Sequence, residues 1–185
     1  SSPISLNLCR NAVGDRGAAA LAALLLPPLS LSTLVLSMNR VGEEGATAIA
    51  SAIAKGGTVR HLGLAANRLG DRGAAAIAGA LGGANRGGDG EIASPAAGDL
   101  AELTLGQNDV EDEGARAIGS MLEKNRVLCK LFLDDNLIGR EGARAIGEAL
   151  LVNPILQRLD LSENAIGSEG ARAIALGIGV GTTAL

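Results

Sequence analysis

The sequence predicts one α/β solenoid, or horseshoe, over residues 1–185, with parallel strands on its concave face and helices on its convex face. The first observation is a repeat, because self-similarity at a fixed period is the signature of solenoid folds. The motif Leu-x-Leu-x-x-Asn occurs six times, ending at Asn11, Asn39, Asn67, Asn108, Asn136 and Asn164. The second observation is composition. Apolar residues make up 47% of the chain and aromatic residues only 1%, which indicates a thin core of many small aliphatic contacts.

The spacing of the motif asparagines sets the repeat length. Successive asparagines are 28 residues apart, except that Asn67 and Asn108 are 41 apart, which equals one repeat plus 13 inserted residues. We therefore predict a single domain of six 28-residue repeats with one insertion. Segment 82–98, GGANRGGDGEIASPAAG, is Gly-rich with few apolar residues. We expect it to be a flexible loop that bulges from the stack, and we favour a neutral insertion over a docking loop.

Each repeat is predicted to be strand, turn and helix. Leu-x-Leu has a period of two, which is typical of a short strand with one face turned inward. Gly recurs six residues after each motif Asn, Ala seven after, and aliphatic residues ten and fourteen after, which is helical spacing. Acidic residues such as Asp15, Glu43 and Asp112 stand at the predicted helix starts and suit the positive end of a helix dipole. One such unit cannot bury its apolar face alone, so the repeats must stack.

The repeats resemble a known family. The segments Asn136-Leu-Ile-Gly-Arg-Glu-Gly-Ala-Arg-Ala-Ile-Gly-Glu-Ala-Leu150 and Asn164-Ala-Ile-Gly-Ser-Glu-Gly-Ala-Arg-Ala-Ile174 are similar to ribonuclease-inhibitor-like leucine-rich repeats, including those of NOD-like receptors. The resemblance covers nearly the whole chain. It implies that the motif asparagines are structural and bond backbone groups in the turns between neighbouring repeats. The structural residues are Asn11, Asn39, Asn67, Asn108, Asn136 and Asn164.

The strand residues that face away from the core are the candidates for partner binding. Phe132, the only aromatic residue, is expected on the concave face within a ring of charged side chains, which is the composition of an interface anchor and its rim. The alternative, a single exposed apolar residue without a function, stays open. The predicted partner-binding residues are Val35, Met38, His61, Lys130, Phe132, Asp134, Asp135, Arg158, Asp160 and Glu163.

No pattern in the sequence indicates catalysis, so we predict no catalytic residue, no cofactor and no metal site. His61 is the only histidine, and it lies about two repeats, roughly 10 Å, from either cysteine. Four acidic residues near Phe132 could ligate a cation. The loop spacing of a calcium site is missing, so a solvated acidic face is favoured. Cys9 and Cys129 lie four repeats apart, roughly 19 Å, and are predicted to be free thiols.

Charge and hydropathy exclude two classes of partner. The net charge is −4, with +2 on residues 1–98 and −6 on residues 99–185. A dense basic stripe for nucleic acid is therefore missing. The apolar stretch from Leu21 to Leu36 is interrupted by Pro27 and Pro28, so we predict no membrane segment. With only two cysteines, a reducing, cytoplasmic setting is favoured, and an organelle or cilium stays open.

These observations favour a non-catalytic protein-binding module or scaffold that holds a partner protein through its concave strand face. Two alternatives stay open. Ran GTPase activators share this repeat class, and in that case Arg40 or Arg68 would be the rim residues that act on a bound GTPase. The chain could also be a structural subunit of a large assembly, because no polar cap is visible at either end of the predicted stack.

Overall fold

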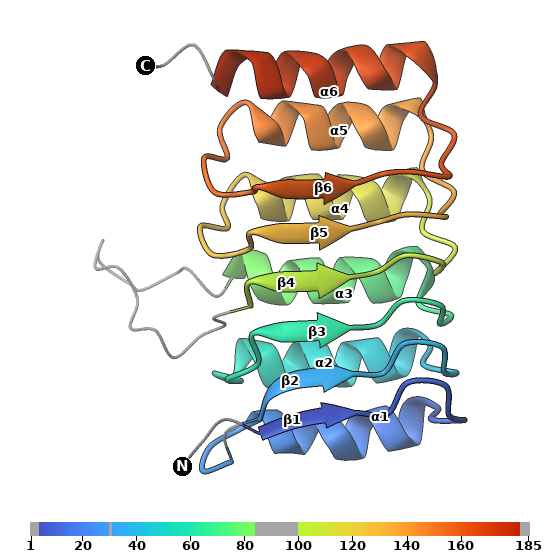
Figure 1. The fold of residues 1–185 in the computed structure, drawn as a ribbon, viewed down its shortest axis with the longest axis vertical. Helices are drawn as coiled ribbons and strands as arrows, with labels where there is room; N and C mark the ends of the chain where they lie inside the picture. The colour runs from blue at the N-terminus through green and yellow to red at the C-terminus, as the bar shows by residue number, and fades with distance from the viewer. Residues whose placement is uncertain (1–3, 30, 84–99, 182–185) are drawn as a thin grey trace.

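The computed structural model describes residues 4–29, 31–83 and 100–181. Within them, six strands form one parallel sheet in sequence order, and a helix follows each strand (Figure 1). The strands are β1 (Ile4–Asn7), β2 (Leu31–Val35), β3 (His61–Gly63), β4 (Glu102–Thr104), β5 (Lys130–Phe132) and β6 (Arg158–Asp160). The helices are α1 (Asp15–Ala22), which continues as a short 3₁₀ turn, η1 (Ala23–Leu25), then α2 (Glu43–Ala54), α3 (Gly70–Gly83), α4 (Asp112–Leu122), α5 (Arg140–Leu150) and α6 (Gly167–Gly181). The predicted fold class is confirmed.

The strands pair in the register that the motif predicts. The first motif leucines are direct partners across the sheet, from Leu6 and Leu34 to Leu131 and Leu159. Strand β3 pairs directly with β4, with Leu62 opposite Leu103, although 41 residues separate them. In Figure 1 the helices spread over a longer stack than the strands, so the strand face is the concave one.

Helix α3 extends further than the sequence indicates. It includes Gly82 and Gly83, the first two residues of the predicted loop. A Cβ added at Gly82 would lie 3.5 Å from Cα of Met121, so the helix packs closely on α4 there. Glycine is a weak helix former, and this close packing favours the helical conformation at Gly82. The remainder of the predicted loop, 84–98, lies outside the described residues.

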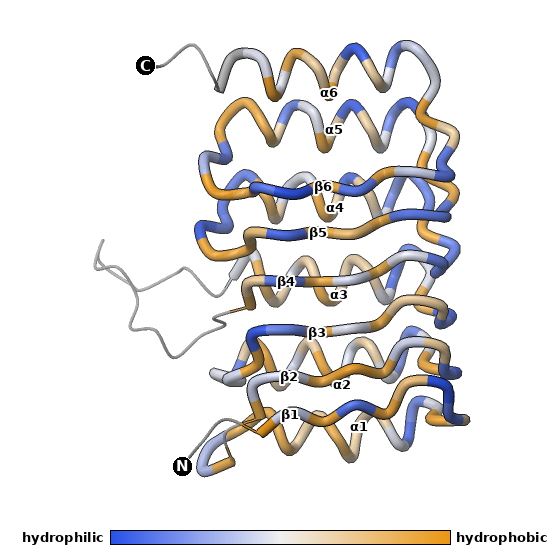
Figure 2. Tube along the Cα trace, in the orientation of Figure 1, coloured by the Kyte–Doolittle hydropathy of each residue, from blue (hydrophilic) through white to orange (hydrophobic). Residues whose placement is uncertain are grey.

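The core lies between the sheet and the helices. Figure 2 shows hydrophobic positions recurring at the same places in successive strands and helices. Leu34, Leu62, Leu103 and Leu131 are at most 1% exposed, whereas the end-strand leucine Leu159 is only partly buried. The aliphatic helix positions are buried in the same way. Each inner repeat therefore completes its core on both neighbours, as expected for a solenoid.

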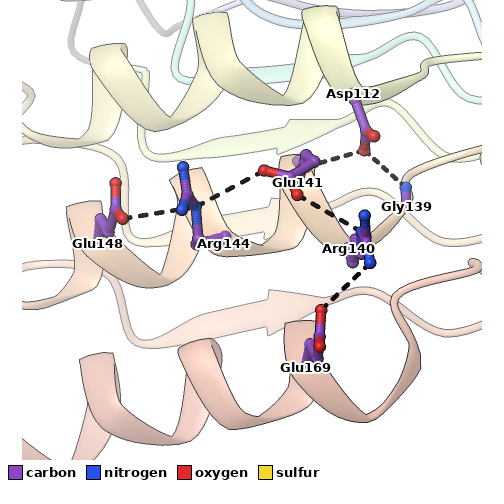
Figure 3. A network of polar contacts seen from close by, with 8 residues as sticks. Asp112, Gly139, Arg140, Glu141, Arg144, Glu148 and Glu169 are labelled. Carbon is purple, nitrogen blue, oxygen red and sulfur yellow. Dashed lines mark hydrogen bonds and ion pairs between the residues drawn. The ribbon is translucent and has the colours of Figure 1, made fainter.

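The helix starts are tied to the preceding repeat, which the sequence did not indicate. One carboxylate oxygen of Asp112 accepts hydrogen bonds from the N–H groups of Gly139 and Gly142, both at 2.8 Å, at the start of α5 (Figure 3). Asp15 and Asp71 bind the starts of α2 and α4 in the same way. These acidic residues therefore cap the next helix of the stack and satisfy backbone donors that a helix start leaves free.

Two repeats replace this cap with an ion pair. Glu43 and Arg140 stand at the position that is Asp in the first, third and fourth repeats, and they contact Arg72 and Glu169 of the following repeat, each at 3.4 Å. Figure 3 shows Arg140 reaching from α5 toward Glu169 on α6. All four side chains are largely exposed, so each pair contributes at most about 1 kcal/mol.

Helices α5 and α6 pack so closely at Gly147 that replacing this glycine should destabilise the fold. A Cβ added at Gly147 of α5 would lie 2.5 Å from the carbonyl oxygen of Ala173 in α6, whereas one added at Gly79 meets nothing within 4 Å. We expect Gly147→Ala to destabilise the fold by about 2 kcal/mol through overpacking. The matched control Gly79→Ala should stabilise it by about 0.5–1 kcal/mol, because exposed helical glycine is unfavourable. Urea unfolding followed by circular dichroism measures both, and equal effects would contradict the packing.

Candidate functional site

The concave face carries two rows of side chains that cross the strands. His61, Glu102, Lys130 and Arg158 are register partners on successive strands. The Glu102 carboxylate lies 3.1 Å from the Lys130 ammonium and 3.8 Å from His61 Nδ1. The Glu102 carboxylate therefore offsets part of the positive charge of this row between β3 and β5. Arg158 stands at the β6 end of the row.

The second row contains the aromatic residue. Gly63, Thr104, Phe132 and Asp160 are register partners. Phe132 is half-buried, and the guanidinium carbon of Arg158 lies 4.9 Å from the centre of its ring. Such a cation–π contact is worth about 0.5–1 kcal/mol at an exposed site. It holds Arg158 over the ring, so that aromatic and cation form one unit on the surface.

Carboxylates follow the ends of β5 and β6, next to this unit. A Cβ added at Gly106 would lie 2.6 Å from either carboxylate oxygen of Asp134, so the glycine leaves the space that Asp134 fills. Asp135 accepts a hydrogen bond of 2.7 Å from the side-chain amide of Gln107. Glu163 is exposed at the last strand. The result is an acidic rim on the side of Phe132 opposite to Lys130.

Asp160 stays ionised at a lower pH than an ordinary aspartate. Its Oδ1 accepts hydrogen bonds from the hydroxyl of Ser162 at 2.6 Å and from the Ser162 N–H at 3.1 Å. These bonds, with a smaller contribution from the charge of Arg158, hold the pKa of the Asp160 carboxyl below its usual value, although partial burial opposes them. A lowered pKa means that the ionised group stabilises the fold above the pKa of unfolded aspartate. This contribution is lost as the pH falls through the folded pKa.

The Ser162 hydroxyl provides the largest part of this effect, which gives a testable result. We expect Ser162→Ala to raise the pKa of Asp160 toward the usual value, as measured by the carboxyl ¹³C chemical shift against pH. Ser37→Ala, at the equivalent position of the second repeat, is the control and should leave the Asp160 pKa unchanged. A Ser162→Ala protein with an unaltered Asp160 titration would remove the assigned cause.

The structure divides the predicted binding residues into two groups. Phe132 contacts Arg158 and has Asp160 as its register partner, and Lys130 and His61 are linked through Glu102 on the neighbouring row. Asp134, Asp135 and Glu163 follow these two strands in the sequence. Val35 lies on β2, three strands from Phe132, which corresponds to about 14 Å. Met38 is 44% exposed near β2, and its sulfur accepts a hydrogen bond from Arg10. The two groups therefore form one site only for a ligand that spans several strands.

The residue before each motif asparagine adopts a backbone conformation that the sequence does not signal. Each of these six residues has φ between 51° and 60°, the left-handed region that favours glycine, yet none is glycine. They are Arg10, Met38, Ala66, Gln107, Asp135 and Glu163. Left-handed backbone costs about 1–2 kcal/mol per residue. The hydrogen bonds of the following asparagine hold the turn in place.

The motif asparagines form a continuous hydrogen-bonded ladder. The side-chain amide of Asn39 donates to the carbonyls of Leu36 and Ser37 in its own repeat and to Leu8 in the preceding one. Its oxygen accepts from the N–H of Val13 in the preceding repeat. The same two-sided pattern recurs at Asn67, Asn108, Asn136 and Asn164. Asn11 bonds only carbonyls of its own repeat.

Two further asparagines have a structural role that was not predicted from the sequence. Asn125 and Asn153 follow α4 and α5, and each oxygen accepts two backbone N–H bonds from the turn that leads into the next strand. Their amides donate to the carbonyls of Leu81 and Leu122 in the preceding repeats. The available signal was spacing, because both stand 17 residues after a motif asparagine.

The helix side carries a groove that sequence reasoning also missed. It runs between α5 and α6, and Leu151 and Leu176, which are 43% and 56% exposed, contribute its apolar part. Arg144 lies along it, 3.7 Å from both Glu141 and Glu148 (Figure 3). These leucines fall outside the repeated core positions, so periodicity did not mark them. Substitutions in this groove therefore serve as controls for substitutions on the concave face.

Further observations concern the cysteines, metal-ligating side chains and helices of the described part of the chain. Cys9 and Cys129 are free thiols, as predicted. No group of three or more His, Cys, Asp or Glu side chains could hold a metal ion among residues 4–29, 31–83 and 100–181. Over the same ranges, the helices lack the length and hydrophobicity that a bilayer-spanning segment requires. Arg40 and Arg68 are exposed on neighbouring repeats, outside the Phe132 group.

The repeated strand and helix, the parallel sheet and the asparagine ladder define a solenoid of stacked repeats. Comparison with known families agrees. A family model described as Leucine Rich repeat matches residues 4–22, 29–50, 58–78, 100–119 and 152–175, more than half of the chain. The chain belongs to the leucine-rich repeat family. No curated protein sequence matches it.

Similar solved structures share little sequence identity with this chain. The structure titled Leiomodin-1 Actin-Binding Site 2 has 18% identity over 90% of this chain and 73% of that chain, with a TM-score of 0.51. The tropomodulin C-terminal domain of Caenorhabditis elegans has 12% identity over 91% and 93%, with a TM-score of 0.42. An internalin of Listeria monocytogenes has 19% identity over 85% and 48%, with a TM-score of 0.35.

Proposed function

We propose that the chain is a non-catalytic module that binds a partner protein through the C-terminal half of its concave face. The observation that carries the proposal is the Phe132–Arg158 unit, a half-buried aromatic ring with an exposed guanidinium over it, beside a rim of carboxylates. Hot spots of protein interfaces are rich in aromatic residues and arginine enclosed by polar residues. The structure titled Leiomodin-1 Actin-Binding Site 2 has a similar fold, and its title names a protein, actin, as the partner. This supports a protein-binding function.

The rim defines the chemistry of the partner. Asp134, Asp135, Asp160 and Glu163 present carboxylates, while Lys130 is engaged by Glu102. A partner segment with lysine or arginine beside an apolar side chain complements this arrangement, because the apolar group can pack on Phe132 while the cations meet the rim. Binding should therefore weaken as salt concentration rises. A cytoplasmic setting, where Cys9 and Cys129 stay reduced, belongs to this proposal.

The finer family assignment is also a proposal. We propose that these are ribonuclease-inhibitor-like repeats, similar to those of NOD-like receptors. The support is the 28-residue period and a helix of at least eight residues in every repeat.

Affinity capture with matched variants tests the binding proposal. The immobilised chain is exposed to an extract of its source cells, beside Phe132→Ala, Asp160→Lys and Leu151→Ala. The last variant removes an exposed leucine on the helix side of the same repeat as Phe132. We expect one set of proteins to be lost from Phe132→Ala and Asp160→Lys and retained by Leu151→Ala. If Leu151→Ala loses the partner and the concave variants keep it, the binding surface lies on the helices.

A further inference from the structure

The turns that lead from strand to helix form one edge of the solenoid, which we name the turn edge. In Figure 1 these turns stack in a nearly straight line along the right-hand side. The residues on either side of each motif asparagine line this edge in two rows. The front row, before the asparagine, is Arg10, Met38, Ala66, Gln107, Asp135 and Glu163, and the back row, after it, is Ala12, Arg40, Arg68, Asp109, Leu137 and Ala165. Apart from the half-buried Ala66, all of them are exposed.

Two series of backbone hydrogen bonds keep the rows side by side. In the front row, the N–H of Met38 donates to the carbonyl of Ala65 in the following repeat at 2.7 Å. In the back row, the N–H of Arg40 donates to the carbonyl of Val13 in the preceding repeat at 2.9 Å. The front row follows the strands and the back row leads into the helices. The front row is therefore nearer to the concave face.

The charge of the turn edge changes sign halfway along the stack. The charged residues of the two rows are Arg10, Arg40 and Arg68 in the first three repeats, then Asp109, Asp135 and Glu163 in the last three. Within the described residues, neither Arg40 nor Arg68 forms an ion pair. The carboxylate of Asp135 accepts a hydrogen bond from the neutral amide of Gln107. Each half of the edge can therefore attract a surface of the opposite charge.

Two large apolar side chains stand in the same rows. Met38, in the front row of the second repeat, is 44% exposed, and Leu137, in the back row of the fifth repeat, is 56% exposed. Both repeats have a neighbour on each side in the sheet, so this exposure is a property of the turn edge. Arg40 stands behind Met38, and Asp135 stands in front of Leu137. The second repeat is thus apolar in front and basic behind, while the fifth is acidic in front and apolar behind.

We propose that two copies of this chain associate through the turn edge about a two-fold axis. An axis that runs along the strands and passes between β3 and β4 reverses both the order of the repeats and the order of the rows. It places Met38 opposite Leu137 of the second copy, and Arg40 opposite Asp135. Each contact occurs twice, as in any isologous interface. A register shifted by one repeat would separate Met38 from Leu137, so the apolar pair fixes the position of the axis.

The size of the turn edge sets the strength of the association. At the spacing of parallel strands, six repeats span about 24 Å. An interface of this length belongs to the small class that is typical of transient complexes. We therefore expect a reversible dimer that forms at high protein concentration. Self-association goes beyond the proposed function, and it is measured on the chain alone, without the partner of the concave face.

Charge-reversed variants test the Arg40–Asp135 contact. Arg40→Asp and Asp135→Arg each bring like charges together at both symmetry-related contacts. Both positions accept the new side chain, because Asp109 is equivalent to Arg40, and Arg10, with φ of 60°, is equivalent to Asp135, with φ of 51°. Sedimentation equilibrium from micromolar to millimolar concentration measures association. The wild type should pass from monomer to dimer and no further, and each variant alone should associate about 10-fold more weakly.

An equimolar mixture of the two variants should recover the association of the wild type. In the mixed dimer, an arginine meets an aspartate at both contacts, because each variant supplies what the other lacks. This recovery requires the two-fold arrangement and this register. A mixture that associates no better than the single variants would contradict the proposal, as would a wild type that stays monomeric or grows beyond a dimer.

A second pair of variants tests the apolar contact. Leu137→Arg places a guanidinium opposite Met38 and close to Arg40 of the second copy, so it should weaken association about 10-fold or more. The matched control is Leu176→Arg, because Leu176 is also 56% exposed but lies on the helix side. It should leave association unchanged, and circular dichroism checks that both variants are folded. Retention of the dimer by Leu137→Arg, or equal losses in the two variants, would show that the turn edge is not the interface.

Discussion

Replacing Asn136 with alanine is expected to destabilise the fold by about 3–5 kcal/mol, because a buried polar group left without its partner costs about 1–3 kcal/mol. Asn136 is only 6% exposed. Its oxygen accepts bonds from the backbone N–H groups of Asn108 at 3.1 Å and Val110 at 3.0 Å. Its amide donates to the carbonyls of Leu105, Leu133 and Asp134. Alanine removes the acceptor of both N–H groups in a place that water does not reach.

The control for Asn136→Ala is Asn11→Ala. Asn11 occupies the same motif position but is exposed and bonds only the carbonyls of Leu8 and Cys9. We expect it to lose less than about 1 kcal/mol. Urea unfolding measures both. Because each repeat is stabilised mainly by its neighbours, Asn136→Ala should also broaden the transition as the two halves of the stack uncouple. Equal losses for the two variants would show that the ladder does not join the repeats.

Phe132→Ala is expected to lower affinity for the partner protein by about 30-fold or more, the loss typical of a hot-spot aromatic residue. The substitution removes the ring and also the surface that positions Arg158, whose guanidinium carbon lies 4.9 Å from the ring centre. Leu151→Ala, the matched apolar truncation on the helix side, should change affinity less than two-fold, roughly the noise of a surface substitution. Isothermal titration with the captured partner gives both values. Comparable losses would place the binding surface elsewhere.

The carboxylate rim should affect binding in a different way from the Phe132 ring. Asp160→Lys should slow association with a basic partner and weaken its dependence on salt, because rim charges act mainly on the encounter. Phe132→Ala should mainly raise the dissociation rate. Surface plasmon resonance at two salt concentrations separates these effects.

Much of the fold was predictable because its signals are local and repeated. The Leu-x-Leu motif fixed the strand positions, and Leu62 lies opposite Leu103 in spite of the insertion between them. The helix positions followed from the aliphatic spacing. The start of the predicted loop was placed two residues too early because glycines weaken a helix, whereas contact with Met121 of another repeat holds Gly82 in α3.

The features that were missed depend on contacts through space. Asp112 appeared to serve its own helix, but it caps the next one through Gly139 and Gly142. The left-handed backbone at Asp135 and Glu163 has no glycine to signal it. The predicted site grouped Val35 with Phe132 by their equivalent positions, although three strands separate them. Two residues at equivalent repeat positions lie on the same face of the solenoid. The distance between them depends on how many strands separate them in the sheet.

The most direct test of concave-face binding uses the single phenylalanine of the chain. Growth with fluorinated phenylalanine gives one ¹⁹F resonance, at Phe132. The captured partner is titrated in while sedimentation velocity confirms that a complex forms. We predict that the resonance shifts or broadens in proportion to the complex and saturates with it, because the partner covers the ring. A fully formed complex that leaves the ¹⁹F resonance unchanged would contradict binding at this face.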